Sequence, residues 1–215
     1  MIVSPKKGLV NSNPTTVGVS LAIITCLIMA APAYAHHPMG AQVSRNFLEG
    51  FLSGLGHPMI GLDHLLFAIA TGLLAATVAR GYWIPIAFVL TALLGTGLHL
   101  LGLDLPILEI AIAVSVLGVG ILLAMTRKPR IDVMAILAAI AGLFHGYAYG
   151  EAIIGATRVP LFAYLLGFTL IQLAIALAAY KAAQIVQKSF DQASSLRLAG
   201  CTILGAGMVF LTNSL

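Results

Sequence analysis

The chain has 215 residues, of which 60% are hydrophobic and 8% are charged, and its mean hydropathy is +1.04. A soluble domain carries about 25% charged residues, so this composition cannot build a normal water-facing surface and indicates a membrane protein. The formal net charge of +4 is spread along the chain without a basic cluster, which argues against nucleic acid as a partner.

Residues 1–35 have the features of a cleavable signal peptide. Lys6-Lys7 form a positive segment, residues 17–30 form a short apolar core, and Ala33-Tyr34-Ala35 fits the A-x-A cleavage pattern. The alternative is an uncleaved anchor helix. Cleavage after Ala35 would place His36 and His37 at the start of the mature chain on the outer face, and residues 36–215 would form one transmembrane domain.

Six apolar stretches of spanning length follow. Each approaches the ~20 residues that cross a bilayer as a helix, and these continuous runs lack the alternation of a barrel strand. The sequence therefore predicts an all-α, polytopic membrane protein with six transmembrane helices. The predicted spans are Met59–Ala79, Tyr82–Leu101, Leu105–Met125, Val133–Tyr149, Val159–Tyr180 and Ala193–Asn213.

The segment ahead of the first span, residues 47–56, is also apolar apart from Glu49. One straight helix from this segment to Ala79 would be about 50 Å long, which is too long for a simple crossing. Gly54, Gly56 and Pro58 favour a break. We therefore expect an interfacial or re-entrant segment, followed by a helix that begins near Pro58.

The basic residues predict the orientation. An exported N-terminus would place the first, third and fifth connections in the cytoplasm, and more Lys and Arg fall there than outside, as the positive-inside rule requires. The prediction is a multi-pass protein of a bacterial inner membrane with both mature termini outside. The inner basic residues are Arg80, Arg127, Lys128, Arg130, Lys181 and Lys188, and the outer ones are Arg45 and Arg158.

Ionisable side chains within spans are costly and usually functional. When each is placed by its depth in its own span, all of them fall in the outer third of the membrane. Imidazoles and carboxylates without a thiolate suit Ni²⁺, Co²⁺, Zn²⁺ or Mn²⁺ better than Cu⁺, and the mature chain would hold one cysteine and no CxxC pair. These residues are Asp63, His64, His99, Glu109, His145 and Glu151.

The roles of several candidates stay open. His57 and His64 are seven residues apart, so a straight helix would separate them by about 10 Å, too far to share one ion. A kink at residues 56–58 would bring His57 inward. Alternatively, the two imidazoles would bind the ion one after the other, at successive positions along its path. Asp63 either binds the ion or orients another imidazole.

Structural interpretations also remain for other polar and small residues. His99 alone could donate a structural hydrogen bond, and Glu109 would be interfacial if the third span starts later than predicted. Gln172 is interpreted as an interhelical hydrogen-bonding residue, with a place in the permeation path as the alternative. Glycines four residues apart in the fourth span predict a close helix contact; they are Gly142, Gly146 and Gly150.

Two motifs resemble those of a known family. Residues 57–64, HPMIGLDH, are similar to the HP-x-x-G-x-DH motif of the HupE/UreJ proteins, and residues 144–151, FHGYAYGE, resemble that family's FHG-x-AHG motif followed by an acidic residue. The predicted leader, the histidine directly after it and the six predicted spans also resemble that family. Tyr149 stands where many members have a second histidine, which removes a potential ligand.

The resemblance implies uptake of Ni²⁺ or Co²⁺ as the transported substrate, without an organic cofactor. The implied metal path is lined by residues of the two motifs, namely His57, Asp63, His64, His145 and Glu151. His36 and His37 are a candidate capture site, and the membrane potential would favour inward movement.

A permease rather than an enzyme is expected, since neither HExxH nor GxxxxGK[ST] occurs. The partners are the divalent ion and the lipid bilayer, and a homo-oligomer is left open. The alternatives are a membrane redox protein that binds haem through paired histidines and a metal accessory subunit that does not transport.

Overall fold

The computed structural model describes residues 43–189 and 192–215, and these ranges contain seven helices and no strand. The proposed signal peptide, His36 and His37 lie outside the described residues. The helices are α2 (Phe47–Ile60), α3 (Leu62–Ala75), α4 (Trp83–Leu100), α5 (Leu108–Ala124), α6 (Ile131–Glu151), α7 (Arg158–Ser189) and α8 (Gln192–Asn213).

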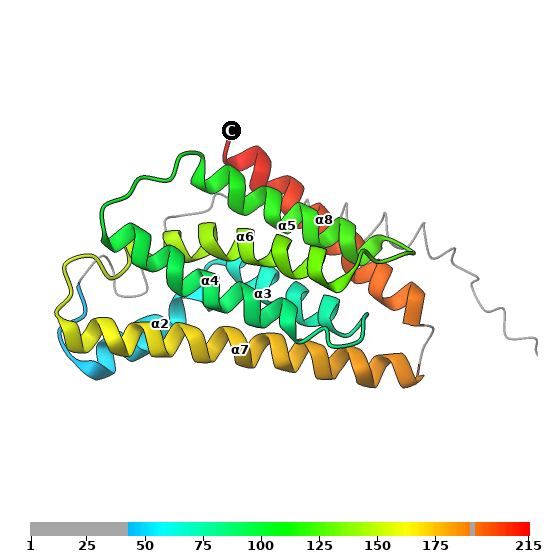
Figure 1. Cartoon of the computed structure of the whole chain (residues 1–215), viewed down its shortest axis with the longest axis horizontal. Helices are drawn as coiled ribbons and strands as arrows, with labels where there is room; N and C mark the ends of the chain where they lie inside the picture. The colour runs from blue at the N-terminus through cyan, green and yellow to red at the C-terminus, as the bar shows by residue number, and fades with distance from the viewer. Residues whose placement is uncertain (1–42, 190–191) are drawn as a thin grey trace, which may run out of the picture.

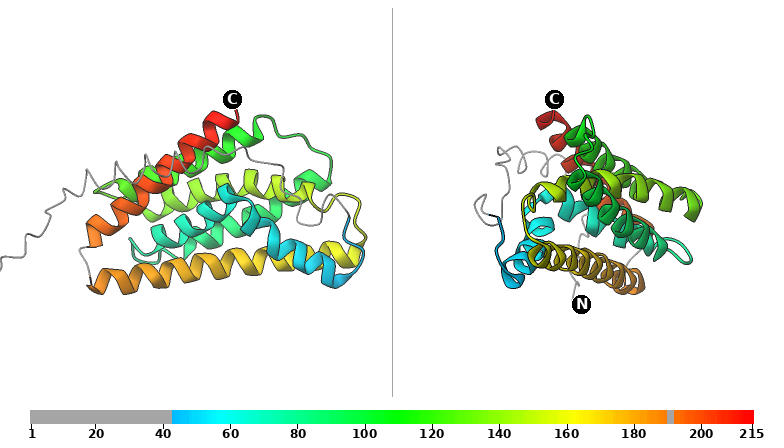
Figure 2. Two further views of the ribbon diagram at one scale, coloured as in Figure 1. Left: turned by 180° about the vertical axis from the view of Figure 1, so that it is seen from behind. Right: turned by 60° about the vertical axis from the view of Figure 1, so that its left-hand side comes forward.

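The helices form a bundle in which α3 is central (Figure 1). Helix α4 packs along α6, α5 packs along α8, and α7 lies beside α2 and α3. Helix α3 also contacts α4, α5 and α8. The views from behind and from the side show these pairs around the short α3 (Figure 2). A side chain on α3 therefore meets side chains from several other helices.

Large apolar side chains cover the outside of the bundle. Leu90, Phe162 and Ile185 are 61%, 64% and 66% exposed, and an exposed apolar surface of this kind marks contact with lipid. Helices α4, α6, α7 and α8 are each long and apolar enough to cross a membrane, and the bent pair α2–α3 makes up to five such spans. The described residues thus confirm an all-helical, multi-pass membrane protein.

The break near the first predicted span lies at Gly61 and not at residues 54–58. Helix α2 continues through Pro58 to Ile60, and α3 leaves it at an angle of 80°. The prediction of a helix that begins near Pro58 is therefore wrong, because proline costs a helix one hydrogen bond without always ending it. A Cβ atom on Gly61 would lie 2.7 Å from Cδ2 of His64, so glycine at the bend leaves room for that imidazole.

Glu49, the acidic residue in the apolar segment before the break, belongs to the cap of α2. Its backbone N–H donates to Oδ1 of Asn46 over 2.9 Å, and its carboxylate accepts from the Asn46 amide and the Arg45 backbone N–H, each over 2.7 Å. This reciprocal arrangement satisfies N–H groups that would otherwise lack partners at a helix start. Glu49 therefore has a structural explanation at the helix terminus.

The glycine stripe of α6 packs against α4, as predicted. A Cβ atom on Gly142 or Gly146 would collide with backbone atoms of α4. The hydroxyl of Thr96 in α4 donates to the carbonyl oxygen of Gly146 over 2.7 Å, which ties the two backbones together. Because His145 precedes Gly146, this contact fixes the depth of its imidazole in the bundle.

Candidate metal site

The structure brings together the two histidines at the centres of the two motifs. His64, near the start of α3, and His145, in the last two turns of α6, are 81 residues apart in sequence. Their Nδ1 atoms lie 2.7 Å apart. The side chains are 6% and 0% exposed. Two imidazoles thus meet nitrogen to nitrogen inside the bundle.

Apolar rings and one hydroxyl hold the imidazole of His145. The ring centroids of Phe67 and Phe88 lie 4.7 Å and 5.6 Å from that of His145. On the other side of the imidazole, Nε2 lies 2.8 Å from Oγ of Ser115 in α5. The ring is therefore positioned by α3, α4 and α5 while it is carried by α6.

Asp63 adds a negative charge next to this pair. Its Oδ1 accepts a hydrogen bond from the backbone N–H of His64 over 2.8 Å. A cation at the two imidazoles would gain from this charge, whether Asp63 binds it directly or stabilises it from nearby.

The bend at Gly61 brings His57 toward His64. The two ring centroids are 5.9 Å apart, closer than the separation of about 10 Å in a straight helix. Of the two arrangements left open by the sequence, the structure has a bend between His57 and His64, although the bend lies at Gly61 and not at residues 56–58.

Tyr149 occupies the position between the histidines and a buried polar network. Its ring lies 4.6 Å from that of His64, and its hydroxyl donates to Oε1 of Gln172 over 3.2 Å. The hydroxyl of Tyr164 donates to the backbone oxygen of Tyr149 over 2.8 Å. Gln172, fully buried in α7, makes the predicted interhelical hydrogen bond. The ring of Tyr149 thus lies beside His64, while its hydroxyl bonds Gln172.

The other predicted site residues lie apart from the pair. The ring of His99 packs against Tyr147, with centroids 4.3 Å apart, and its buried Nδ1 has no hydrogen-bond partner among the described residues. Glu109 is exposed in the first turn of α5, which begins at Leu108, and Glu151 is exposed at the end of α6. Within the described ranges, no group of three or more His, Cys, Asp or Glu could hold a metal ion.

Sequence reasoning missed several residues that border the pair. Ser115 is the one hydroxyl in the apolar sequence of α5, and that isolation is a signal that could have identified it. Phe67 and Phe88 gave no signal, since aromatic residues in an apolar helix are common. Their roles depend on how α3, α4 and α6 pack together.

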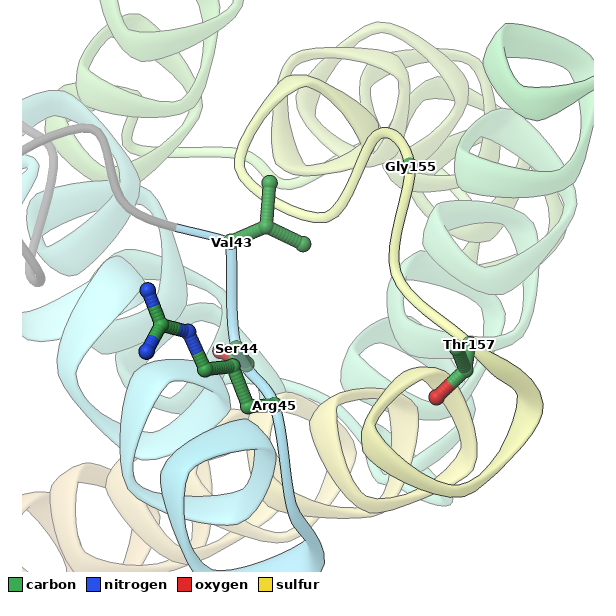
Figure 3. Close-up of a pocket in the computed structure, with 5 residues that line it drawn as sticks. All are labelled: Val43, Ser44, Arg45, Gly155 and Thr157. Carbon is green, nitrogen blue, oxygen red and sulfur yellow. The ribbon is translucent and has the colours of Figure 1, made fainter.

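A separate cavity of about 500 Å³ lies between the chain ahead of α2 and the connection from α6 to α7 (Figure 3). Among the described residues, no imidazole or carboxylate lines it, and the side chains that do line it are not typical ligands of a divalent cation. Its lining residues are Val43, Ser44, Arg45, Gly155 and Thr157.

Comparison of the sequence with known proteins identifies its family. The chain is 39% identical to Protein HupE of Rhizobium leguminosarum bv. viciae over 128 residues, which are 59% of this chain and 64% of that protein. The alignment thus spans just under two thirds of the relative's length. No solved structure matches the chain. The model of the HupE / UreJ protein family matches residues 24–210, and the chain therefore belongs to the HupE/UreJ family.

Proposed function

We propose that this protein carries Ni²⁺ or Co²⁺ inward across a bacterial inner membrane, with His64 and His145 as the central ligands. The observation that carries the proposal is the 2.7 Å approach of their Nδ1 atoms beside the carboxylate of Asp63. Membership of the family, which is associated with nickel and cobalt uptake for hydrogenase and urease, supports the same substrate.

The nitrogen pair suits one transition-metal ion. Two imidazole nitrogens bound to one ion at ~2.1 Å and near 90° lie about 3 Å apart, close to the distance between these two Nδ1 atoms. Binding would also require the rings to turn toward the ion and the proton between the nitrogens to leave. Nickel and cobalt both accept imidazole and carboxylate ligands. Water would fill the remaining positions, and a site with few protein ligands can release its ion as well as bind it.

His57, Asp63 and Tyr149 lie next to His64 and would line the immediate path of the ion. His57 would bind the ion before or after the central pair, since its ring lies beside that of His64. The negative charge of Asp63 would stabilise a bound divalent ion. His99, Glu109 and Glu151 are proposed as outer stations, and His36 and His37 as the capture site of the mature chain.

The proposed topology has six spans. The bent pair α2–α3 forms the first, and α5, with 17 residues, is just long enough at the lower end of the range for membrane helices. The connections 76–82 and 125–130 lie at one end of the bundle, with the end of α7, and the connections 101–107 and 152–157 lie at the other (Figure 1). The basic residues predicted to face the cytoplasm fall at the first end.

The membrane potential would drive the ion inward. It is worth about 2.3 kcal/mol per charge per 100 mV, and thus about 4.6 kcal/mol for a divalent ion. The proposed transport needs no bound nucleotide.

The test is accumulation of nickel, cobalt, zinc and manganese, measured side by side in cells that express the protein. We expect nickel or cobalt uptake, and His64→Ala and His145→Ala should each abolish it at normal membrane levels of the protein. Thr71→Val is the control, because it removes a buried hydroxyl of α3 that bonds only its own helix, at the Ala68 carbonyl.

Normal uptake by both histidine variants would remove the site assignment. A Soret band in the purified protein would instead favour the haem-binding alternative. Uptake by the purified protein alone in liposomes separates a carrier from a subunit that only assists transport.

A further inference from the structure

We infer that Ser115 is a positioning residue of the proposed metal site, which fixes the tautomer of His145 so that the lone pair of Nδ1 points toward His64. The expected effect on metal binding rests on the proposed function. Its structural basis is a chain of two hydrogen bonds that links Nε2 of His145 to the backbone of α5.

Ser115 Oγ has two close polar neighbours. It lies 2.7 Å from the carbonyl oxygen of Ile112 and 2.8 Å from Nε2 of His145. The carbonyl oxygen can only accept, and the hydroxyl has a single hydrogen to donate. The hydroxyl hydrogen therefore goes to Ile112, and the oxygen of Ser115 accepts the N–H of His145 Nε2.

The opposite arrangement is unfavourable. If the hydroxyl donated to Nε2 of His145, the hydroxyl oxygen of Ser115 and the carbonyl oxygen of Ile112 would face each other at 2.7 Å without a hydrogen between them. That distance is typical of a hydrogen-bonded pair of oxygens, and their lone pairs would repel. Both distances are satisfied only when His145 carries its proton on Nε2.

The tautomer of His145 determines which nitrogen can bind an ion. With the proton on Nε2, Nδ1 has a free lone pair directed at Nδ1 of His64. Without an ion, the His64 ring donates its Nδ1–H to that lone pair. Binding of an ion by both Nδ1 atoms would require the His64 proton to move to Nε2 of its ring or to leave with a base, so that each Nδ1 offers a lone pair. Metal-binding histidines usually donate their other ring N–H in this way, which orients the ring and increases its basicity.

The position of Ser115 supports a role beyond packing. It is the one hydroxyl in α5, whose sequence is LEIAIAVSVLGVGILLA, and a polar group costs free energy in such a helix unless it finds a partner. The partner here comes from α6, so the hydroxyl connects the site to a third helix.

The test compares Ser115→Ala with Ser115→Thr, which keeps a hydroxyl that can bond the same carbonyl. Co²⁺ binding is titrated in the purified full-length protein. Because loss of a residue that orients a ligand typically costs 10- to 100-fold in metal affinity, we expect Ser115→Ala to bind Co²⁺ about tenfold more weakly. Ser115→Thr and the control Thr71→Val should remain within about twofold of the wild type.

A second measurement reads the tautomer without metal. The ¹⁵N chemical shifts of labelled histidine distinguish a protonated from an unprotonated ring nitrogen, and His145 is assigned by comparison with His145→Ala. We expect a protonated Nε2 in the wild type and in Ser115→Thr, and a changed pair of signals in Ser115→Ala.

Two results would overturn the inference. One is wild-type affinity in Ser115→Ala when His145→Ala binds weakly. The other is a protonated Nδ1 of His145 in the wild type. By contrast, wild-type affinity in His145→Ala would refute the proposed metal site itself, so the two failures are distinguishable.

Discussion

His145 is fully buried, yet both of its ring nitrogens have polar partners, His64 on one side and Ser115 on the other. A buried polar group without partners costs about 1–3 kcal/mol, and here that cost is avoided in the absence of an ion. Two phenylalanine rings hold the plane of the imidazole. The imidazole of His145 is therefore held in place by partners within the protein, which fits the proposed role as a ligand that binds and releases an ion.

Tyr149→Phe should change uptake little, because the hydroxyl of Tyr149 bonds Gln172 and not the histidines. The loss of this hydrogen bond should reduce stability by about 1 kcal/mol. Uptake rate and thermal stability in detergent check the two expectations. A loss of uptake as large as that of His64→Ala would show that the hydroxyl takes part in the site.

Tyr149→His, in contrast, places an imidazole beside His64, since the two rings are already 4.6 Å apart. A third nitrogen ligand should tighten metal binding, and slower release should lower the maximal rate. A titration and a saturation curve of uptake, compared with those of Tyr149→Phe, measure both effects. Weaker binding than in Tyr149→Phe would contradict this reading of the position.

Helices α4 and α6 depend on small residues at their contact. A Cβ atom on Gly95 would collide with the backbone of α6 near Leu143 and Tyr147, whereas one on Gly97 would meet nothing within 4 Å. We expect Gly95→Ala to separate the helices and to lower both stability and uptake. Gly97→Ala, two residues away on the same helix, should leave both unchanged or slightly raise stability.

Thermal unfolding and membrane levels of the two alanine variants measure this difference. Equal stability of both variants would show that the helices can adjust, and that the spacing between α4 and α6 does not depend on Gly95.

The end of α5 depends on Lys128. Its ammonium donates to the carbonyl oxygens of Leu122, Leu123 and Met125 over 2.7–2.9 Å. Partial burial, with a smaller effect of the Arg197 guanidinium, lowers the pKa of Lys128 below its usual value. The three hydrogen bonds offset the free-energy cost of partly burying the ammonium group. They also give partners to terminal carbonyl groups of the helix, which otherwise lack them.

Lys128→Ala should therefore destabilise the protein by about 1–2 kcal/mol, as expected for the loss of hydrogen bonds from a charged group. Lys181→Ala, which removes an exposed lysine of α7 that lies over the Tyr180 ring, is the control and should have a smaller effect. Chemical or thermal unfolding in detergent compares the two, and an equal effect would contradict the capping role.

The whole molecule should cross the membrane six times. In a background with Cys26→Ser and Cys201→Ser, Asp104→Cys and Ser214→Cys should react with a membrane-impermeant maleimide in spheroplasts. Arg127→Cys should react only after the membrane is opened. These expectations follow from the basic residues of the connections and from the positive-inside rule.

The reverse labelling pattern would show an inverted protein. If Asp104→Cys and Arg127→Cys both reacted in spheroplasts, α5 would not cross the membrane, and the count of six spans would be wrong.

The sequence by itself determined the helical membrane character, the approximate limits of most helices and the two motifs that meet at the site. It did so because apolar composition and length decide whether a segment enters lipid, and each of these is a local property. It also predicted that a second helix packs closely along the glycine stripe from Gly142 to Gly150, and that Gln172 makes an interhelical hydrogen bond. Both features need only a neighbouring helix.

Only the tertiary structure decided which side chains meet. The bend lies at Gly61 and not near Pro58, and a Cβ atom there would lie 2.7 Å from Cδ2 of His64. The 2.7 Å approach of His64 to His145 and the contact of Ser115 with Nε2 depend on the packing of α3, α5 and α6. Such contacts join residues far apart in sequence, and hydrophobic periodicity specifies which face of a helix is buried but not which side chain it meets there.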